Sequence, residues 1–270
     1  MIDFTLNTYR SLISTALKEG YHFRTFEDFL SSRIDGKVII LRHDVDELAG
    51  NALKIAELEN SLDIRATYYF RTVSQSNNPE VIRKIASMGH EIGYHYEDLS
   101  NANGNYKTAI LSFEKNLQYF RQFYPVRTIS MHGSSSSKFD NRDLWNHFKF
   151  EDFGLIGEPY ISLDFNNVFY LTDTGFSWNG GKYAVWDVVE NNFDLSFHSS
   201  QQIIQCLKEK KFPNSCMILS HTLWTDNIIQ WTWLHVREFL RNHIKLLAKN
   251  NPLISKLYRK MVSLYWNHSQ

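Results

Sequence analysis

The chain has 270 residues, and barrels of this length commonly form one domain. Lys and Arg total 29, as do Asp and Glu, so the balanced charge attracts no polyanion and we expect no nucleic acid partner. No apolar run of about 18 residues could span a bilayer, and the start shows no basic region followed by an apolar one, which predicts a cytoplasmic protein.

The first half of the chain alternates between helical and strand patterns. Apolar residues recur with helical spacing over 4–18, and a short helix is expected over 25–32. The predicted strands that follow are 37–43, 64–70, 91–95 and 126–131, and the helices between them are 50–60, 79–88 and 105–123. Strands separated by helices in this way predict parallel βαβ units.

The second half is less regular. Residues 160–190 are expected to be rich in strands, and a helix over 199–210 leads into a strand over 215–220. Helices are expected over 228–250 and 252–267. Because no repeat or linker is visible, the sequence predicts a single domain over residues 1–270.

Histidine and aspartate recur at the ends of the predicted strands. Asp44 and Asp46 follow the run Val38–Leu41, and His95, His132 and His221 each follow a short apolar run. The carboxyl ends of parallel strands are where α/β proteins bind ligands. Imidazole and carboxylate suit a divalent transition metal, most often zinc.

These residues resemble the polysaccharide deacetylase family, carbohydrate esterase family 4, over about residues 36–245. Asp44-Val45-Asp46 is similar to the family's first motif, Gly89-His90-Glu91-Ile92-Gly93-Tyr94-His95 to the start of its second, and Leu219-Ser220-His221 to its last. The resemblance implies a distorted (β/α) barrel of about seven parallel strands, with helical extensions at 1–35 and 246–270. It also implies a metal-dependent hydrolase that removes an acyl group, in particular N-acetyl, from an amino sugar or glycan.

The resemblance also implies roles for individual residues. Asp44 would be the general base, Asp46 and His95 would bind the metal, and His221 would be the general acid. Asp173 begins a stretch similar in type to the fourth motif and could orient His221. His43 should face away from Asp44, because neighbouring side chains on a strand alternate faces, and we interpret it as structural.

The chain departs from the family at one ligand. The family places a second histidine four residues after the one matched by His95, and here that position is Leu99. Because catalytic zinc usually has three protein ligands, we expect His132 to be the third, with Glu97 and Asp98 as rival donors. His132 could instead contact the substrate.

Two further alternatives stay open. The missing histidine also suits a non-catalytic, carbohydrate-binding relative of the deacetylases. The basic amphipathic segment 253–266 is expected to pack on its own domain or on a second subunit, with a membrane surface as the less favoured partner. The sequence does not predict the oligomeric state.

Overall fold

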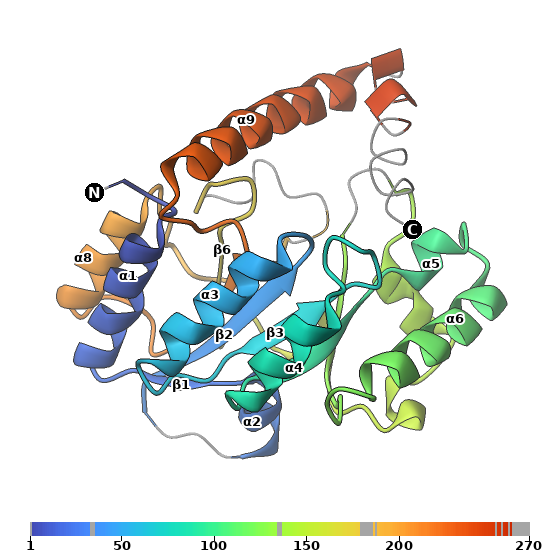
Figure 1. Cartoon of the computed structure of the whole chain (residues 1–270), viewed down its shortest axis with the longest axis horizontal. Helices are drawn as coiled ribbons and strands as arrows, with labels where there is room; N and C mark the ends of the chain where they lie inside the picture. Colours follow the sequence, from blue (N-terminus) through green and yellow to red (C-terminus); the bar gives the residue numbers. More distant parts are fainter. Residues whose placement is uncertain are drawn as a thin grey trace.

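Seven parallel strands form one curled sheet surrounded by helices (Figure 1). The computed structural model describes residues 2–32, 36–133, 137–178, 186, 188–251, 253, 254, 256–258 and 260. The sheet curls into a half-barrel, which confirms the expected distorted (β/α) barrel of about seven strands.

The strands follow the order β5-β4-β3-β2-β7-β6, with β1 beside the first part of β2. Their bounds are β1 His22–Arg24, β2 Val38–Val45, β3 Thr67–Phe70, β4 Glu91–Tyr96, β5 Ile129–Met131, β6 Phe169–Thr172 and β7 Ser215–His221. Every pair is parallel, so the carboxyl ends of all these strands lie at one end of the half-barrel.

The helices pack mainly on the outside of the sheet. They are α1 Leu6–Lys18, α2 Phe26–Ser31, α3 Ala49–Asn60, α4 Pro79–Ser87, α5 Asp98–Asn101, α6 Tyr106–Phe120, α7 Pro159–Ser162, α8 Ser200–Lys208 and α9 Ile228–Asn250, with 3₁₀ helices at Asn141–Asn146 and Phe150–Phe153. The α4 helix shows why they start where they do: Asn78 caps it and Pro79 occupies its first turn. Within the described residues, no helix is both long and apolar enough to cross a membrane.

One expectation about secondary structure was wrong in part, and one short strand was not predicted. The predicted strand-rich region 160–190 contains one described strand, β6, because its aromatic residues also fill the core from loops, as Phe165 and Trp178 do. Residues 179–185 and 187 lie outside the described residues, as does the end of the helix expected over 252–267. The three-residue strand β1 was not predicted, because so short a segment shows no periodicity.

Neighbouring side chains of β2 point to opposite faces of the sheet and so belong to two different hydrophobic cores. Ile40 belongs to the cluster inside the curl, whereas Ile39 and Leu41 belong to the larger core under the helices. The inner cluster consists of Phe26, Ile40, Tyr69, Phe165, Val168, Tyr170, Met217 and Leu219. Arg42 and Asp44 lie two and four residues after Ile40, so their side chains lie on the same face of β2 and point into the half-barrel.

The α2 helix closes the amino-terminal end of the half-barrel. The backbone N–H of Phe26 donates to Thr67 Oγ1 at 2.8 Å, and that of Glu27 donates to Glu91 Oε2 at 2.9 Å. Thr67 and Glu91 are the first residues of β3 and β4, so α2 lies at the start of these strands. This leaves the carboxyl ends of the strands for chemistry.

A buried carboxylate holds α3 against the outer face of the sheet. Glu59 accepts a hydrogen bond from the Tyr68 hydroxyl at 2.6 Å and from Tyr9, and its Oε1 lies 2.7 Å from His43 Nε2. His43 therefore faces away from Asp44, as predicted. Burial alone would raise the pKa of Glu59, but His43 and Tyr68 lower it below its ordinary value.

We expect Glu59→Ala to lower the free energy of unfolding by about 3–5 kcal/mol at pH 7, because it removes one partner from a buried charged network. The depressed pKa of Glu59 means that its contribution is complete above the ordinary carboxyl pKa and is lost as the pH falls through the folded-state value. Denaturant unfolding at pH 7 and in acid measures both effects. Glu57→Ala, an exposed change on the same helix, should cost less than about 0.5 kcal/mol, and equal losses would refute this role of Glu59.

Candidate active site

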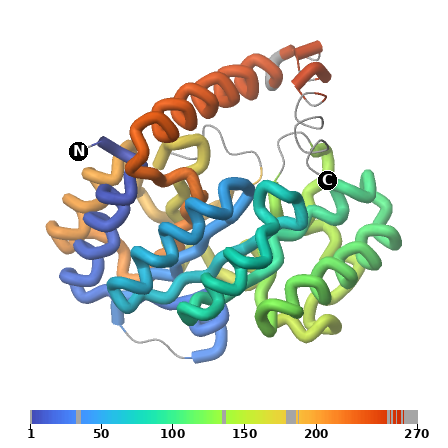
Figure 2. The backbone as a smooth tube through the Cα atoms, viewed as in Figure 1, coloured from blue at the N-terminus to red at the C-terminus, as the bar shows by residue number. Residues whose placement is uncertain are grey.

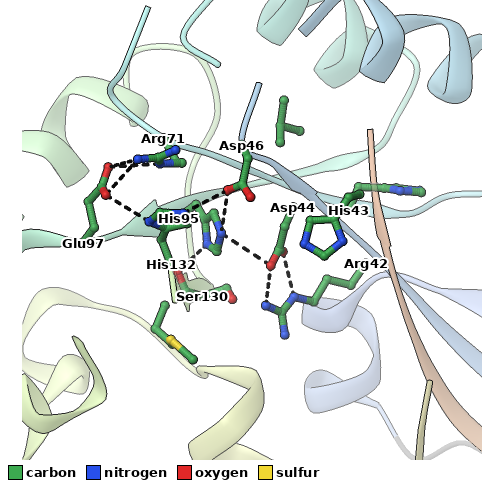
Figure 3. A network of polar contacts seen from close by, with 12 residues as sticks. Arg42, His43, Asp44, Asp46, Arg71, His95, Glu97, Ser130 and His132 are labelled. Carbon is green, nitrogen blue, oxygen red and sulfur yellow. Dashed lines mark hydrogen bonds and ion pairs between the residues drawn. The ribbon is translucent and has the colours of Figure 1, made fainter. Parts of the chain in front are cut away.

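The carboxyl ends of four strands bring the predicted residues together (Figure 3). Asp44 lies opposite His221 in the register of β2 and β7, and Asp46 follows directly after β2. His95 comes from β4 and His132 follows β5. All five lie where the sequence predicted a site, at one end of the half-barrel.

Asp46 Oδ1 faces two imidazole rings. It lies 3.4 Å from His95 Nε2 and 3.5 Å from His132 Nε2, which is longer than a normal hydrogen bond. This oxygen is buried, and no described residue forms a hydrogen bond with it. A buried carboxylate oxygen without a donor is costly, so the arrangement needs a physical explanation.

On the side away from Asp46, the Nδ1 atom of each imidazole faces a hydrogen-bond acceptor. His95 Nδ1 lies 3.0 Å from the carbonyl oxygen of Ser130, and His132 Nδ1 lies 3.0 Å from Glu97 Oε2. A carbonyl and a carboxylate can only accept, so each Nδ1 carries the proton in the hydrogen-bonded arrangement. In the neutral rings, both Nε2 lone pairs then point toward Asp46, as in histidines prepared to bind a metal.

Glu97 and Asp98, the rival donors, have other partners. Arg71 donates to both oxygens of Glu97 at 2.9 Å, and together with His132 it lowers the pKa of this buried carboxyl to about 2. Asp98 instead accepts hydrogen bonds from Tyr94 at 2.7 Å and from helix α6. Of the three candidates, only His132 is placed against Asp46.

Leu99, which stands where the family has its second histidine, is buried in the hydrophobic core. Its side chain therefore contributes to packing under the helices. Leu99 is thus a core residue, while His132 approaches Asp46 from the next strand.

Asp44 is held by an arginine that the sequence analysis missed. Arg42 donates from Nε and Nη2 to the two oxygens of Asp44, at 2.9 and 2.7 Å, and both side chains are buried. The guanidinium also lies 4.8 Å from the ring centroid of Tyr160. Burial would raise the pKa of Asp44, but Arg42 and His95 lower it, so the carboxylate is ionised and fixed in orientation.

Asp173 and His221 meet although they are far apart in the chain. Asp173 Oδ1 lies 2.7 Å from His221 Nδ1, and the same carboxylate accepts hydrogen bonds from Trp224 Nε1 at 2.8 Å and Ser220 Oγ at 3.1 Å. Burial would lower the pKa of His221, but Asp173 raises it to about 10, with smaller contributions from Asp46 and Asp44. His221 is therefore held as a proton donor.

Solved structures with a similar fold are carbohydrate esterases. A family 4 pseudoenzyme from Bacillus anthracis has 13% identity and a TM-score of 0.41 over 78% of this chain and 62% of its own. A family 4 carbohydrate esterase from Bacillus subtilis has 13% identity and a TM-score of 0.42 over 85% of this chain and 83% of its own. A peptidoglycan deacetylase from Bdellovibrio bacteriovorus has 14% identity and a TM-score of 0.40 over 82% of this chain and 53% of its own.

No protein-family profile and no curated protein matches the chain. The chain spans about three fifths of the Bacillus anthracis pseudoenzyme. All of these similarities are low, at 13–14% identity and TM-scores of 0.40–0.42.

Proposed function

We propose that this chain is a metal-dependent hydrolase that removes an acyl group, specifically N-acetyl, from an amino sugar or glycan precursor. The observation that carries the proposal is the position of Asp46 Oδ1. No described residue forms a hydrogen bond with this buried oxygen, which faces the Nε2 atoms of His95 and His132. Asp44, held by Arg42, and His221, held by Asp173, lie at the same end of the half-barrel.

The donor set fits a divalent ion. At zinc–ligand distances of 2.0–2.2 Å, neighbouring atoms of a tetrahedral set lie about 3.4 Å apart, and Asp46 Oδ1 lies 3.4 and 3.5 Å from His95 and His132. As they stand, the described residues contain no group of three or more His, Cys, Asp or Glu side chains close enough to hold a metal. The proposal therefore requires a small movement of these side chains toward a common centre.

Zinc is the ion that these donors favour. Two imidazoles and one carboxylate form a common catalytic zinc set, which leaves a position open for water or substrate. Glu97 and the Ser130 carbonyl would orient the two imidazoles through Nδ1, as second-sphere partners of metal-bound histidines do. A divalent ion bound there would polarise the acyl carbonyl and make water more acidic.

The remaining residues then divide the proton transfers between them. Asp44, oriented by Arg42, takes a proton from the attacking water while the oxygen of that water bonds to the acyl carbon. The C–N bond breaks as His221 gives its proton to the leaving nitrogen, and Asp173 holds the ring through Nδ1. The products are a carboxylic acid and a free amine, and each such acid–base step contributes about 10²–10⁴-fold to the rate.

An aromatic side chain beside the site supports a sugar substrate. A Cβ added to Gly133, the residue after His132, would lie only 2.8 Å from Trp186 Cβ. Trp186 is thus placed close to the proposed ligands, and an indole offers a flat apolar surface with one hydrogen-bond donor.

The central experiment compares the native chain with Asp44→Asn, using acetate release from N-acetylated amino sugars with zinc supplied. We expect turnover to fall by at least about 10²-fold and zinc content to stay nearly intact, because only the base is lost. Asp152→Asn, an exposed change, serves as the control. Loss of zinc in Asp44→Asn would show that Asp44 is a metal ligand. If the native chain binds glycan but neither binds zinc nor releases acetate, it is a binding protein.

The third ligand is tested by zinc affinity, measured by competition with a chromophoric chelator. We expect His132→Ala to weaken zinc binding by an order of magnitude or more and Glu97→Gln by about 10-fold or more, because the first removes a donor and the second its orienting partner. Asp98→Asn should bind zinc as the native chain does. Normal binding by His132→Ala together with a loss in Glu97→Gln would assign the ligand to the carboxylate and His132 to substrate recognition.

The acid is tested by the pH dependence of kcat/KM. Asp173→Asn removes the main interaction that raises the pKa of His221 above its ordinary value, so that pKa should fall. Since the rate declines as the pH rises through the pKa of the acid, the alkaline limb should move to lower pH by at least about one unit. If the alkaline limb keeps its position and kcat/KM is lower by the same factor at every pH, Asp173 has only a structural role.

A further inference from the structure

The loop that carries Asp46 lacks the residue types that usually hold such a turn. Asp46, Glu47 and Leu48 join β2 to α3, and the backbone of Leu48 is left-handed, with φ 57° and ψ 49°. This conformation is costly for a residue with a Cβ, whereas glycine adopts it freely. Leu48 is also the N-cap residue of α3, and its apolar side chain accepts no hydrogen bond from the first turn. The shape of the loop therefore depends on contacts from elsewhere in the chain.

Helix α9 supplies one of these contacts. Arg237 Nη1 donates to Glu47 Oε2 at 2.9 Å, and Arg237 Nη2 donates to Glu47 Oε1. The two side chains are 17% and 7% exposed. Figure 2 shows α9 running along one edge of the molecule, and this pair places its inner side against the loop that follows β2. Because a bidentate pair fixes orientation as well as distance, Arg237 determines how the Glu47 carboxylate lies.

Both partners of this pair are held from further sides. The Arg237 guanidinium lies 4.7 Å from the centroid of the Trp233 ring, and its Nη2 lies 3.2 Å from Glu238 Oε1. The backbone carbonyl of Glu47 accepts a hydrogen bond from Thr222 Oγ1 at 2.7 Å. Glu47 is thus fixed through its side chain and its backbone, directly after Asp46.

We propose that Arg237 is a positioning residue for Asp46, which rests on the proposed metal site. By holding Glu47, Arg237 keeps the left-handed loop in place and Asp46 Oδ1 facing the two imidazoles. Without this bidentate donor, the Glu47 carboxylate turns toward water and Leu48 relaxes to a less costly conformation. Either movement carries Asp46 away from the proposed zinc site.

Neighbouring groups do not replace Arg237. Arg241 Nη1 lies 3.8 Å from Glu47 Oε1, but it lies 2.7 Å from Glu238 Oε1 and donates a hydrogen bond there. The imidazoles of His95 and His132 are oriented by the Ser130 carbonyl and by Glu97, which Arg237 does not contact. Loss of Arg237 therefore displaces one ligand and leaves the other two in place.

Zinc affinity of the full chain, measured by competition with a chromophoric chelator, tests this inference without any measurement of turnover. Arg237→Met removes the charge and keeps the apolar stem, and it should raise the dissociation constant for zinc about 5-fold or more. Arg237→Lys keeps the charge but not the bidentate geometry, so its affinity should lie between those of Arg237→Met and the native chain. If Arg237→Met does not fold, Arg237→Lys decides the question, with an expected loss of about threefold.

Two controls separate positioning from a general loss of stability. Glu59→Ala should destabilise the fold beneath α3 while leaving Arg237 and Glu47 paired. Arg127→Met breaks the exposed ion pair with Glu27 at the other end of the half-barrel. Both should bind zinc within about twofold of the native chain, and circular dichroism at the assay temperature shows whether each variant is folded.

The outcomes separate this inference from the proposed function. Native zinc affinity in folded Arg237→Met would overturn the positioning role and leave the proposed metal site standing. An equal loss of affinity in Glu59→Ala would also overturn it, because zinc binding would then follow stability alone. A native chain that binds no zinc would refute the metal site itself, and the role of Arg237 with it.

Discussion

Compensation of buried negative charge governs the end of the half-barrel where the candidate site lies. Taking a carboxylate out of water costs several kcal/mol unless charge and hydrogen bonds replace the solvent. Asp44 has Arg42, Glu97 has Arg71 and His132, and Asp173 has His221, Trp224 and Ser220. Among the carboxylates of the described residues, only Asp46 has a buried oxygen without a hydrogen bond, and two imidazoles face it. The pattern of satisfied and unsatisfied carboxylates distinguishes the proposed ligand from its neighbours.

The fold explains how these charges can be so close. In β2 the period of two directs Arg42 and Asp44 inward and His43 outward, so a single strand contributes to two networks on opposite faces of the sheet. His43 reaches Glu59 beneath α3, while Asp44 faces His95 across the inside of the curl. The two networks share a backbone but no side chain, which is why stability and proton transfer can be tested by separate substitutions.

Much of this arrangement could be predicted from the sequence. Parallel strands end at the same edge, so a histidine or aspartate after each apolar run identifies residues that meet in space. Arg42 could have been found by the same logic, because it lies two residues before Asp44 on the same face of the strand. The family resemblance suggested that Asp173 could orient His221, but the contact itself joins residues 48 positions apart and depends on how β6 lies beside β7.

The orientation of α9 was also beyond the sequence. An amphipathic pattern predicts a helix over 228–250 and implies that its apolar face is buried. Leu234 is buried in this way, but in the second half of the helix Glu238 and Asn242 are buried and Leu240 and Leu247 are exposed. The reversal follows from tertiary contacts, because Arg237 is fixed by Glu47 and Asn242 by the Gly175 carbonyl. Helix periodicity specifies which residues share a face, and only the partners of that face decide which way it points.

Glu47 connects the candidate site with α9 physically. Its carboxylate binds Arg237 of α9, and its carbonyl accepts a hydrogen bond from Thr222, the residue after His221, at 2.7 Å. A substitution at Glu47 would disturb the loop of Asp46, the end of β7 and the seat of α9 together, so its effects could not be assigned to any one of them. Trp233 is part of this arrangement, because the Arg237 guanidinium lies 4.7 Å from the centroid of its ring. A change at Trp233 would therefore also affect the residue that anchors α9 to the loop of Asp46.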